Sequence, residues 1–133
     1  MQAVREQVTA MLIENTSDLI RQVEHRLLPS GAVVDIASLI NGTFLVLAAD
    51  SLSLYRTAAQ VGDPLGNGLI ASVALPVSLP LQDGRFLQEH RAGYVGLSGG
   101  YVLLITLNDA QLFSSKEDAL RFRTELVRLS LAH

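Results

Sequence analysis

The pentapeptide GLSGG at residues 96–100 carries the most suggestive chemistry, because it matches the G-x-S-x-G pattern of serine hydrolases. In those enzymes the serine leaves a strand on a sharp turn and enters a helix, whose first amides help to form the oxyanion hole. Here Ser98 is followed by a β-branched and aromatic run at residues 101–107, which favours a strand. The histidine downstream is His133, the last residue, where we expect fraying. We therefore predict that Ser98 is a turn residue, that the two glycines after it adopt positive φ, and that the chain has no catalytic residue.

A second glycine-rich stretch, GDPLGNG at residues 62–68, has the composition of a phosphate-binding loop. Phosphate binding needs the amides of a following helix, or a lysine with serine or threonine in the P-loop pattern. The next residues are strand-like, and the single lysine of the chain is Lys116. We interpret residues 59–68 as a surface loop, because Asp-Pro and Asn-Gly are ordinary turn dipeptides. Two roles stay open for it, a lid beside a pocket or a plain connection.

Titratable side chains are densest at residues 82–91. An acid–base pair or a polar binding site could be drawn from this stretch, and our speculative ligand-binding residues are Asp83, Arg85, Glu89 and His90. The alternative is a solvated connection with one helical turn, in which Arg85 and Glu89 pair four residues apart. We favour the connection and keep the four residues as the candidate polar site.

Histidine spacing does not indicate a metal site. His25 and His90 each follow a glutamate, but adjacent residues point to different sides of a helix or strand and do not converge on one ion by spacing. We therefore predict no metal and no cofactor. His25 is interpreted as a surface residue near the C-terminus of a helix, where a positive charge is mildly favourable.

Length and composition indicate one compact domain over residues 1–133. Hydrophobic residues make up 49% of the chain and charged residues 17%, the reverse of a disordered composition. The formal net charge of −3 leaves no basic face for a phosphate backbone, so we do not expect nucleic-acid binding. Cysteine is absent, Arg5 and Glu6 interrupt any signal peptide, and no apolar run is long enough to cross a membrane. We expect a soluble cytoplasmic protein that does not contact membranes.

Two segments have helical spacing. Residues 2–28 lack glycine and proline and place apolar side chains on one face, which predicts a long N-terminal helix. The polar run at residues 15–18 leaves open whether this is one helix or two. Near the other end, Ser114 and Glu117 read as a capping box, which predicts a C-terminal amphipathic helix. Its apolar stripe consists of Ala119, Phe122, Leu126 and Leu129.

Between these segments the apolar period changes to two, as in strands. Residues 33–39 and 43–49 flank Asn41-Gly42, which predicts a hairpin with a type I′ turn. A second reversal at Asp50-Ser51 leads into a strand at residues 52–57. Residues 72–81 also alternate, but they contain two prolines of the same parity, so we place this strand at a sheet edge.

Two hairpin segments resemble each other. FLVLAADSLSLY at residues 44–55 and VLLITLNDAQLF at residues 102–113 share an apolar run, an acidic turn, then a leucine and an aromatic residue. This similarity predicts two like hairpins in the middle of the sheet. The complete expectation is an α+β fold with a long N-terminal helix, a five- or six-stranded mainly antiparallel sheet, and a C-terminal amphipathic helix packed on the sheet.

Residues 31–80 contain only four charged side chains, Asp35, Asp50, Arg56 and Asp63. Both faces of the central strands are apolar, and two helices can cover one face, so we expect a second copy of the chain to shield the other. The predicted function is a non-catalytic, homo-oligomeric interaction or regulatory module, a homodimer that could also bind another protein. The alternative is a small-ligand binding or sensory domain with an apolar pocket between sheet and helices.

Overall fold

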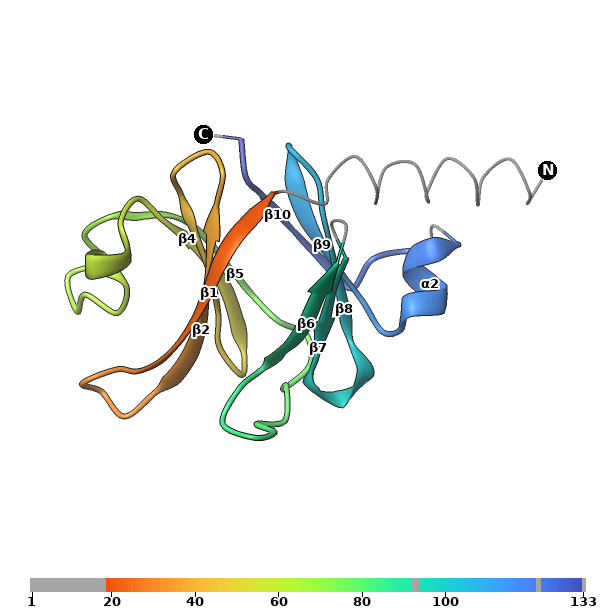
Figure 1. Cartoon of the computed structure of the whole chain (residues 1–133), viewed down its shortest axis with the longest axis horizontal. Helices are drawn as coiled ribbons and strands as arrows, with labels where there is room; N and C mark the ends of the chain where they lie inside the picture. The colour runs from red at the N-terminus through yellow and green to blue at the C-terminus, as the bar shows by residue number, and fades with distance from the viewer. Residues whose placement is uncertain (1–18, 92–93, 122, 133) are drawn as a thin grey trace.

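Antiparallel strands are the main secondary structure of the chain that the computed structural model describes, residues 19–91, 94–121 and 123–132. They form two five-stranded sheets in which every strand pairs with its neighbour in chain order. The two sheets face each other as a sandwich (Figure 1). The strands of the first sheet are β1 (Ile20–Leu27), β2 (Val33–Leu39), β3 (Phe44–Leu47), β4 (Ser51–Tyr55) and β5 (Leu69–Ala74). Those of the second are β6 (Leu87–Arg91), β7 (Tyr94–Leu97), β8 (Val102–Ile105), β9 (Asp109–Phe113) and β10 (Val127–Ser130).

The expected α+β fold is therefore wrong, and the long N-terminal helix is its first error. Residues 2–18 of that expected helix lie outside the described residues. Residues 20–27 form β1, which pairs with β2 along its whole length. β1 is an edge strand with several exposed polar side chains, so its apolar residues need not alternate strictly and happen to fall at helical spacing. Pairing with β2 overrides the local helical pattern.

The C-terminal amphipathic helix is the second error. The described helix here, α2 (Lys116–Leu120), has five residues, and its N-cap is Ser115, whose Oγ accepts from Asp118 N–H at 3.1 Å. The expected cap residue Ser114 instead donates to the Asp118 carboxylate. Leu129 belongs to β10, where it alternates with exposed residues and is 2% exposed. Phe122, also assigned to the helix stripe, lies outside the described residues.

The predicted hairpins are confirmed, with one change of turn type. β2 and β3 flank the Asn41-Gly42 turn, and Gly42 has a φ of +87°. Asn41 does not have positive φ, so the turn is not type I′; the bonds Gly42 N–H to Leu39 C=O and Leu39 N–H to Thr43 C=O close a three-residue loop. The hairpin β8–β9 also forms where expected.

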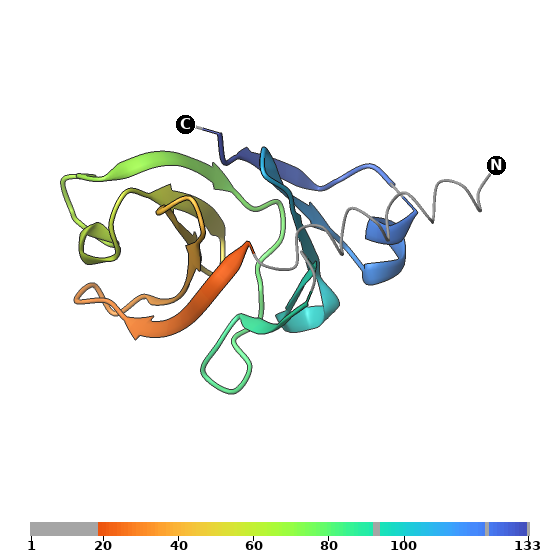
Figure 2. The same ribbon diagram turned by 45° about the horizontal axis from the view of Figure 1, so that its top comes forward.

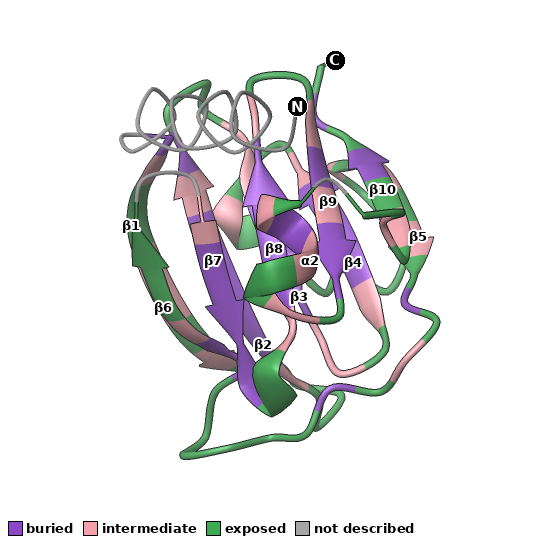
Figure 3. Ribbon diagram, turned by 90° about the vertical axis from the view of Figure 1, so that its right-hand side faces the viewer, coloured by how far each residue is buried: buried purple, intermediate pink, exposed green. Residues whose placement is uncertain are grey.

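The main core lies between the two sheets, and each outer face is covered by the chain's own connection. Figure 1 shows α2 outside the second sheet and the loop 56–68 outside the first. Ala119 of α2 packs with Val102, Leu104 and Phe113, as Figure 3 shows for α2 lying over β8. Val61 of the loop is buried on the other outer face, against Val34, Ile36 and Val46. Both faces of the central strands are thus shielded within one chain.

The two sheets repeat one structural pattern, and we call residues 19–75 the first repeat and residues 86–131 the second repeat. Leu45 pairs with Ala37 and Leu54, while Leu103, 58 positions later, pairs with Val95 and Leu112, also 58 positions later. The similar hairpins predicted from the sequence are the middle strands of each sheet, rather than neighbours in one sheet. The repeats are also in contact at one edge, where β5 lies beside β10 (Figure 3).

Irregular features recur at matching positions, which makes the match between repeats more than a shared strand count. The register of β1 shifts between Ile20 and Gln22, and that of β6 shifts between Leu87 and Glu89. Three backbone hydrogen bonds of the first repeat have a counterpart in the second. Ile40 N–H to Leu19 C=O matches Ser98 N–H to Phe86 C=O, and Leu39 N–H to Thr43 C=O matches Leu97 N–H to Tyr101 C=O. Leu75 N–H to Asp50 C=O matches Leu131 N–H to Asn108 C=O. The match therefore extends through both repeats from their first to their last residues.

The strand predicted at residues 72–81 is wrong over most of its length, because only residues 72–74 belong to a strand, β5, which does lie at a sheet edge. β5 stops at Ala74, and Pro76 and Pro80 belong to the linker between the repeats, residues 76–85. Proline has no N–H to give to a ladder, so the pairing ends where the prolines begin. The linker crosses from the first sheet to the second (Figure 2).

Candidate functional site

Ser98 is part of a turn, as predicted. The short turn Ser98–Gly100 leads into β8 rather than into an α-helix, with φ of +80° at Gly99 and +86° at Gly100. Ser98 is 1% exposed, and its hydroxyl has no hydrogen-bond partner among the described residues. A nucleophilic serine needs an adjacent base and access to substrate, and these surroundings supply neither.

The four residues of the candidate polar site are all exposed and are divided between two elements. Asp83 belongs to a tight turn closed by hydrogen bonds between Gln82 and Arg85, and its φ of +54° with +76° at Gly84 is that of a type I′ turn. Glu89 and His90 are adjacent in β6, so their side chains point to opposite faces. No hydrogen bond or ion pair between described residues joins the turn pair to the strand pair, and the site stays a prediction.

Glu89 has a packing role on the outer face of the second sheet. The expected helical pairing of Glu89 with Arg85 does not form, because residues 87–91 are a strand, and Glu89 lies 3.9 Å from Arg91 instead. A Cβ on Gly96 would lie 2.9 Å from Glu89 Cγ, so the glycine leaves room for this side chain. Burial raises the pKa of the neighbouring Tyr94 hydroxyl, and the Glu89 charge raises it further against the opposing effect of Arg91. Tyr94 is therefore a neutral packing residue.

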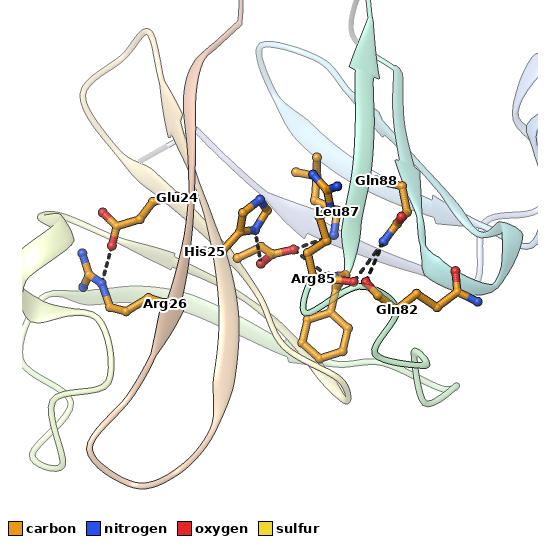
Figure 4. Close-up of polar contacts among 9 residues, drawn as sticks. Glu24, His25, Arg26, Gln82, Arg85, Leu87 and Gln88 are labelled. Carbon is orange, nitrogen blue, oxygen red and sulfur yellow. Dashed lines mark hydrogen bonds and ion pairs between the residues drawn. The ribbon is translucent and has the colours of Figure 1, made fainter.

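The buried polar contact that the sequence did not reveal joins His25 to Asp35. The two residues are direct cross-strand partners in β1 and β2, with His25 Nδ1 2.6 Å from Asp35 Oδ1. Asp35 is 1% exposed, and its Oδ2 accepts backbone N–H groups of Phe86 at 2.7 Å and Leu87 at 2.6 Å. Figure 4 shows His25 facing the start of β6 near Leu87. His25 is thus on a strand rather than at a helix C-terminus.

A histidine oriented by a buried carboxylate is the arrangement that catalytic triads use, so this pair is a chemical candidate. A triad also needs a nucleophile within hydrogen-bond reach of the imidazole. His25 makes no hydrogen bond to a hydroxyl of any described residue. Asp35 Oδ2 accepts from the backbone N–H groups of the first two residues of the second repeat, while Oδ1 contacts His25, so the carboxylate links the two repeats. The signal for it was a lone charge inside the apolar run VVDIASLI.

The loop at residues 59–68 packs on the first sheet. Val61 is 6% exposed, and Arg26 Nη1 donates to Ala58 C=O at 2.7 Å just before the loop. Leu28 packs against Gly62, where a Cβ would lie 2.9 Å from the leucine side chain. Through these contacts the loop covers the outer face of the first sheet. Of the two alternatives, this favours a connection that packs on the sheet over a lid beside a pocket.

A small apolar pocket lies at the end of the sandwich where the repeats meet. Its volume is about 70 Å³. The first repeat contributes Leu19, Leu39, Ile40 and Asn41, and the second contributes Ile105, Thr106, Leu107 and Leu131. Ile40 is 42% exposed and Leu107 is 70% exposed, so apolar surface continues outward from the pocket rim. No titratable side chain of a described residue lines it. The pocket was not predicted because its walls come from segments distant in sequence.

Metal binding, membrane spanning and similarity to known proteins bear on the same question. Within the described ranges, no group of three or more histidine, aspartate or glutamate side chains is placed to hold a metal ion. Among the helices of the described residues, none has the length and apolar character to span a membrane. Comparison of the chain with protein-family models, curated proteins and solved structures finds no match to any of them.

Proposed function

We propose that this chain is a non-catalytic protein-interaction module that binds its partner at the apolar pocket between the two repeats. The supporting observation is the chemistry of that pocket. It is lined by aliphatic side chains, an amide and a hydroxyl, and it is flanked by the exposed aliphatic residues Ile40 and Leu107. Exposed apolar surface around a depression is typical of protein-binding sites. Among the described lining residues there is no side chain that could act as a general acid or base.

The alternative of a small-ligand sensory domain is less well supported by the dimensions of the pocket. Ligand pockets usually measure about 300–1,000 Å³. The pocket here measures about 70 Å³ and is open on one side. A volume of this size accepts part of a side chain from a larger molecule better than it encloses a metabolite.

Self-association stays a prediction. The reason for expecting it was an uncovered apolar sheet face, and the chain itself now covers these faces. The apolar outer faces of the sheets are covered by α2 and by the loop 56–68. Two of the exposed aliphatic residues of the described chain, Ile40 and Leu107, flank the pocket, where a second molecule could cover them. The proposed partner can therefore be another protein or another copy of this chain at the same place.

A photo-crosslinking experiment tests the proposed function in the cells that produce the protein. A photoreactive phenylalanine analogue replaces Leu107 at the pocket rim or, as the control, Leu65, which is 85% exposed in the loop 56–68. We expect discrete protein adducts with the analogue at position 107 and not at position 65. We also expect Ile40→Asp to remove them, because a carboxylate at the rim would be desolvated on binding. No adduct at position 107, or the same adducts at both positions, would contradict the proposal.

A further inference from the structure

The internal repeat supplies a second copy of the pocket walls, and there the site is filled. Each pocket residue has a match: Leu19, Leu39, Ile40 and Asn41 correspond to Phe86, Leu97, Ser98 and Gly99, while Ile105, Thr106, Leu107 and Leu131 correspond to Leu47, Ala48, Ala49 and Leu75. The matching site therefore lies between the same turns, with the roles of the two repeats exchanged.

Two residues of the linker, Leu79 and Pro80, occupy the matching site. Leu79 is 3% exposed and belongs to the same core cluster as Leu47, Leu75 and Leu97. Its backbone N–H donates to Ala49 C=O at 2.8 Å. Pro80 packs on the serine loop, since a Cβ on Gly99 would lie 3.0 Å from Pro80 Cδ. The chain thus binds one of its own extended segments through a leucine side chain, one main-chain hydrogen bond and a proline.

The open pocket presents the same elements without an occupant from the described part of the chain. Its counterpart of Ala49 is Leu107, whose carbonyl receives no N–H from a described residue. Matching loop residues differ in exposure: Ser98, at the filled site, is 1% exposed, whereas Ile40, at the open pocket, is 42% exposed. An engineered apolar cavity of about 150 Å³ accepts benzene. A pocket of about 70 Å³ suits a single aliphatic side chain.

We propose that this pocket binds an extended segment of a partner protein in which a leucine is followed by a proline. The leucine side chain enters the pocket and its N–H donates to Leu107 C=O, as Leu79 does to Ala49 C=O in the matching site. The proline needs no hydrogen-bond acceptor and restricts the segment to an extended conformation before binding, which lowers the entropy lost. The proposal rests on the proposed function and adds the chemistry of the bound segment to it.

A different protein is the source we commit to, rather than a second copy of this chain. The described residues contain three Leu-Pro pairs, at positions 28–29, 75–76 and 79–80. Leu75 and Leu79 are buried in the core, and Leu28 packs with Val61 on the outer face of the first sheet. A second copy would have to open its own structure to offer any of them.

The test uses the linker sequence as a probe. A fluorescent synthetic peptide with the sequence VSLPLQD, residues 77–83, is titrated into the full-length protein and followed by anisotropy. We expect saturable binding that unlabelled peptide competes away. The matched peptide with aspartate in place of the leucine that corresponds to Leu79 should not bind. Ile40→Asp should weaken binding roughly tenfold or more, and Leu65→Asp should leave it unchanged. Thermal unfolding of both variants checks that they are folded.

Three results would overturn the proposal. The first is the absence of saturable binding, and the second is binding that Ile40→Asp does not affect. The third is binding that appears only in a Leu12→Asp variant. Leu12 stands seven positions before Leu19 in the sequence, as Leu79 stands seven positions before Phe86. This result would mean that the chain's own segment is the natural occupant of the pocket. If the peptide fails while crosslinking at position 107 succeeds, the Leu-Pro chemistry is wrong and the interaction module stands. If the peptide binds while crosslinking at position 107 fails, the proposed interaction module is wrong and the Leu-Pro chemistry stands.

Discussion

The first and second repeats share strand order, bulges and turns, and two of the differences between them bear on stability and binding. β1 and β2 have 8 and 7 residues, whereas β6 and β7 have 5 and 4, and the longer hairpin carries His25 and Asp35. The second difference is the linker, which fills one of two matching sites and leaves the other open. The repeat sets the architecture of the molecule, and each of these two differences has its own structural consequence. One fastens the repeats together, and the other leaves a place for something else to bind.

The fastening role of Asp35 predicts the largest effect on stability. Replacing Asp35 with alanine leaves two buried N–H groups, those of Phe86 and Leu87, without their acceptor. A buried N–H group left without its acceptor costs about 1–3 kcal/mol, so the loss for two such groups should be about 2–6 kcal/mol in the free energy of unfolding. Urea denaturation of the full-length protein measures the loss.

His25→Ala is the matched control, because it removes the exposed partner and keeps the bonds from Asp35 to the second repeat. The His25 side chain is 40% exposed, so we expect a loss of about 1 kcal/mol. If His25→Ala and Asp35→Ala destabilised the protein equally, the imidazole rather than the link to Phe86 and Leu87 would be the important contact.

The filled and open sites predict unequal effects from like substitutions. Leu79→Ala removes a leucine that is 3% exposed and leaves a cavity, which costs about 2–5 kcal/mol. Leu107→Ala removes a leucine that is 70% exposed and should change the unfolding free energy by no more than about 0.5 kcal/mol. Thermal unfolding of the two variants under the same conditions makes the comparison. Equal losses would mean that the rim of the open pocket is already buried.

Ser98 predicts a smaller effect of opposite sign. Its hydroxyl is buried without a partner among the described residues, whereas its match in the first repeat is the apolar Ile40. An unsatisfied buried hydroxyl costs about 1–3 kcal/mol, so Ser98→Ala should stabilise the protein by about 1 kcal/mol. A rise in the urea midpoint would show this. A clear loss of stability would mean that the hydroxyl has a partner that the described contacts do not include.

Local signals were sufficient for the hairpins. Asn41-Gly42 and the acidic turn before Ala110 each stand between two apolar segments of strand length, and turn chemistry acts over a few residues. The likeness of residues 44–55 and 102–113 was also visible, and it reflects the repeat. What the likeness did not reveal is that each hairpin lies in a sheet of its own.

The helix predictions were wrong because the sequences of edge strands can resemble those of helices or of solvated connections. β6 consists of LQEHR, which has the composition of a solvated connection, and β1 has apolar residues at helical intervals. Their strand structure depends on a partner strand that is already in place. With those two strands and β10 misassigned, the sequence predicts a single sheet of five or six strands and a second copy of the chain to cover one of its faces.

The candidate site could not be predicted because its parts meet only in the folded chain. Asp35 accepts from Phe86 and Leu87 across a sequence separation of more than 50 residues. The pocket is built from four separate segments, none of which has a motif of its own. The one useful local signal was an isolated aspartate in an apolar strand, which is costly unless it finds hydrogen-bond donors.

The strictly sequential pairing of strands has a consequence for synthesis of the chain. All pairings in the first sheet join strands that are neighbours in the chain, so this sheet can assemble as soon as residue 75 has emerged from the ribosome. Translation of residues 76–131 then takes roughly 3 to 11 s at typical rates. During that interval the leucines of β3 and β4 that later form the core have no opposite sheet. The nascent chain is most exposed to aggregation in this window, and it is where chaperone protection would matter most.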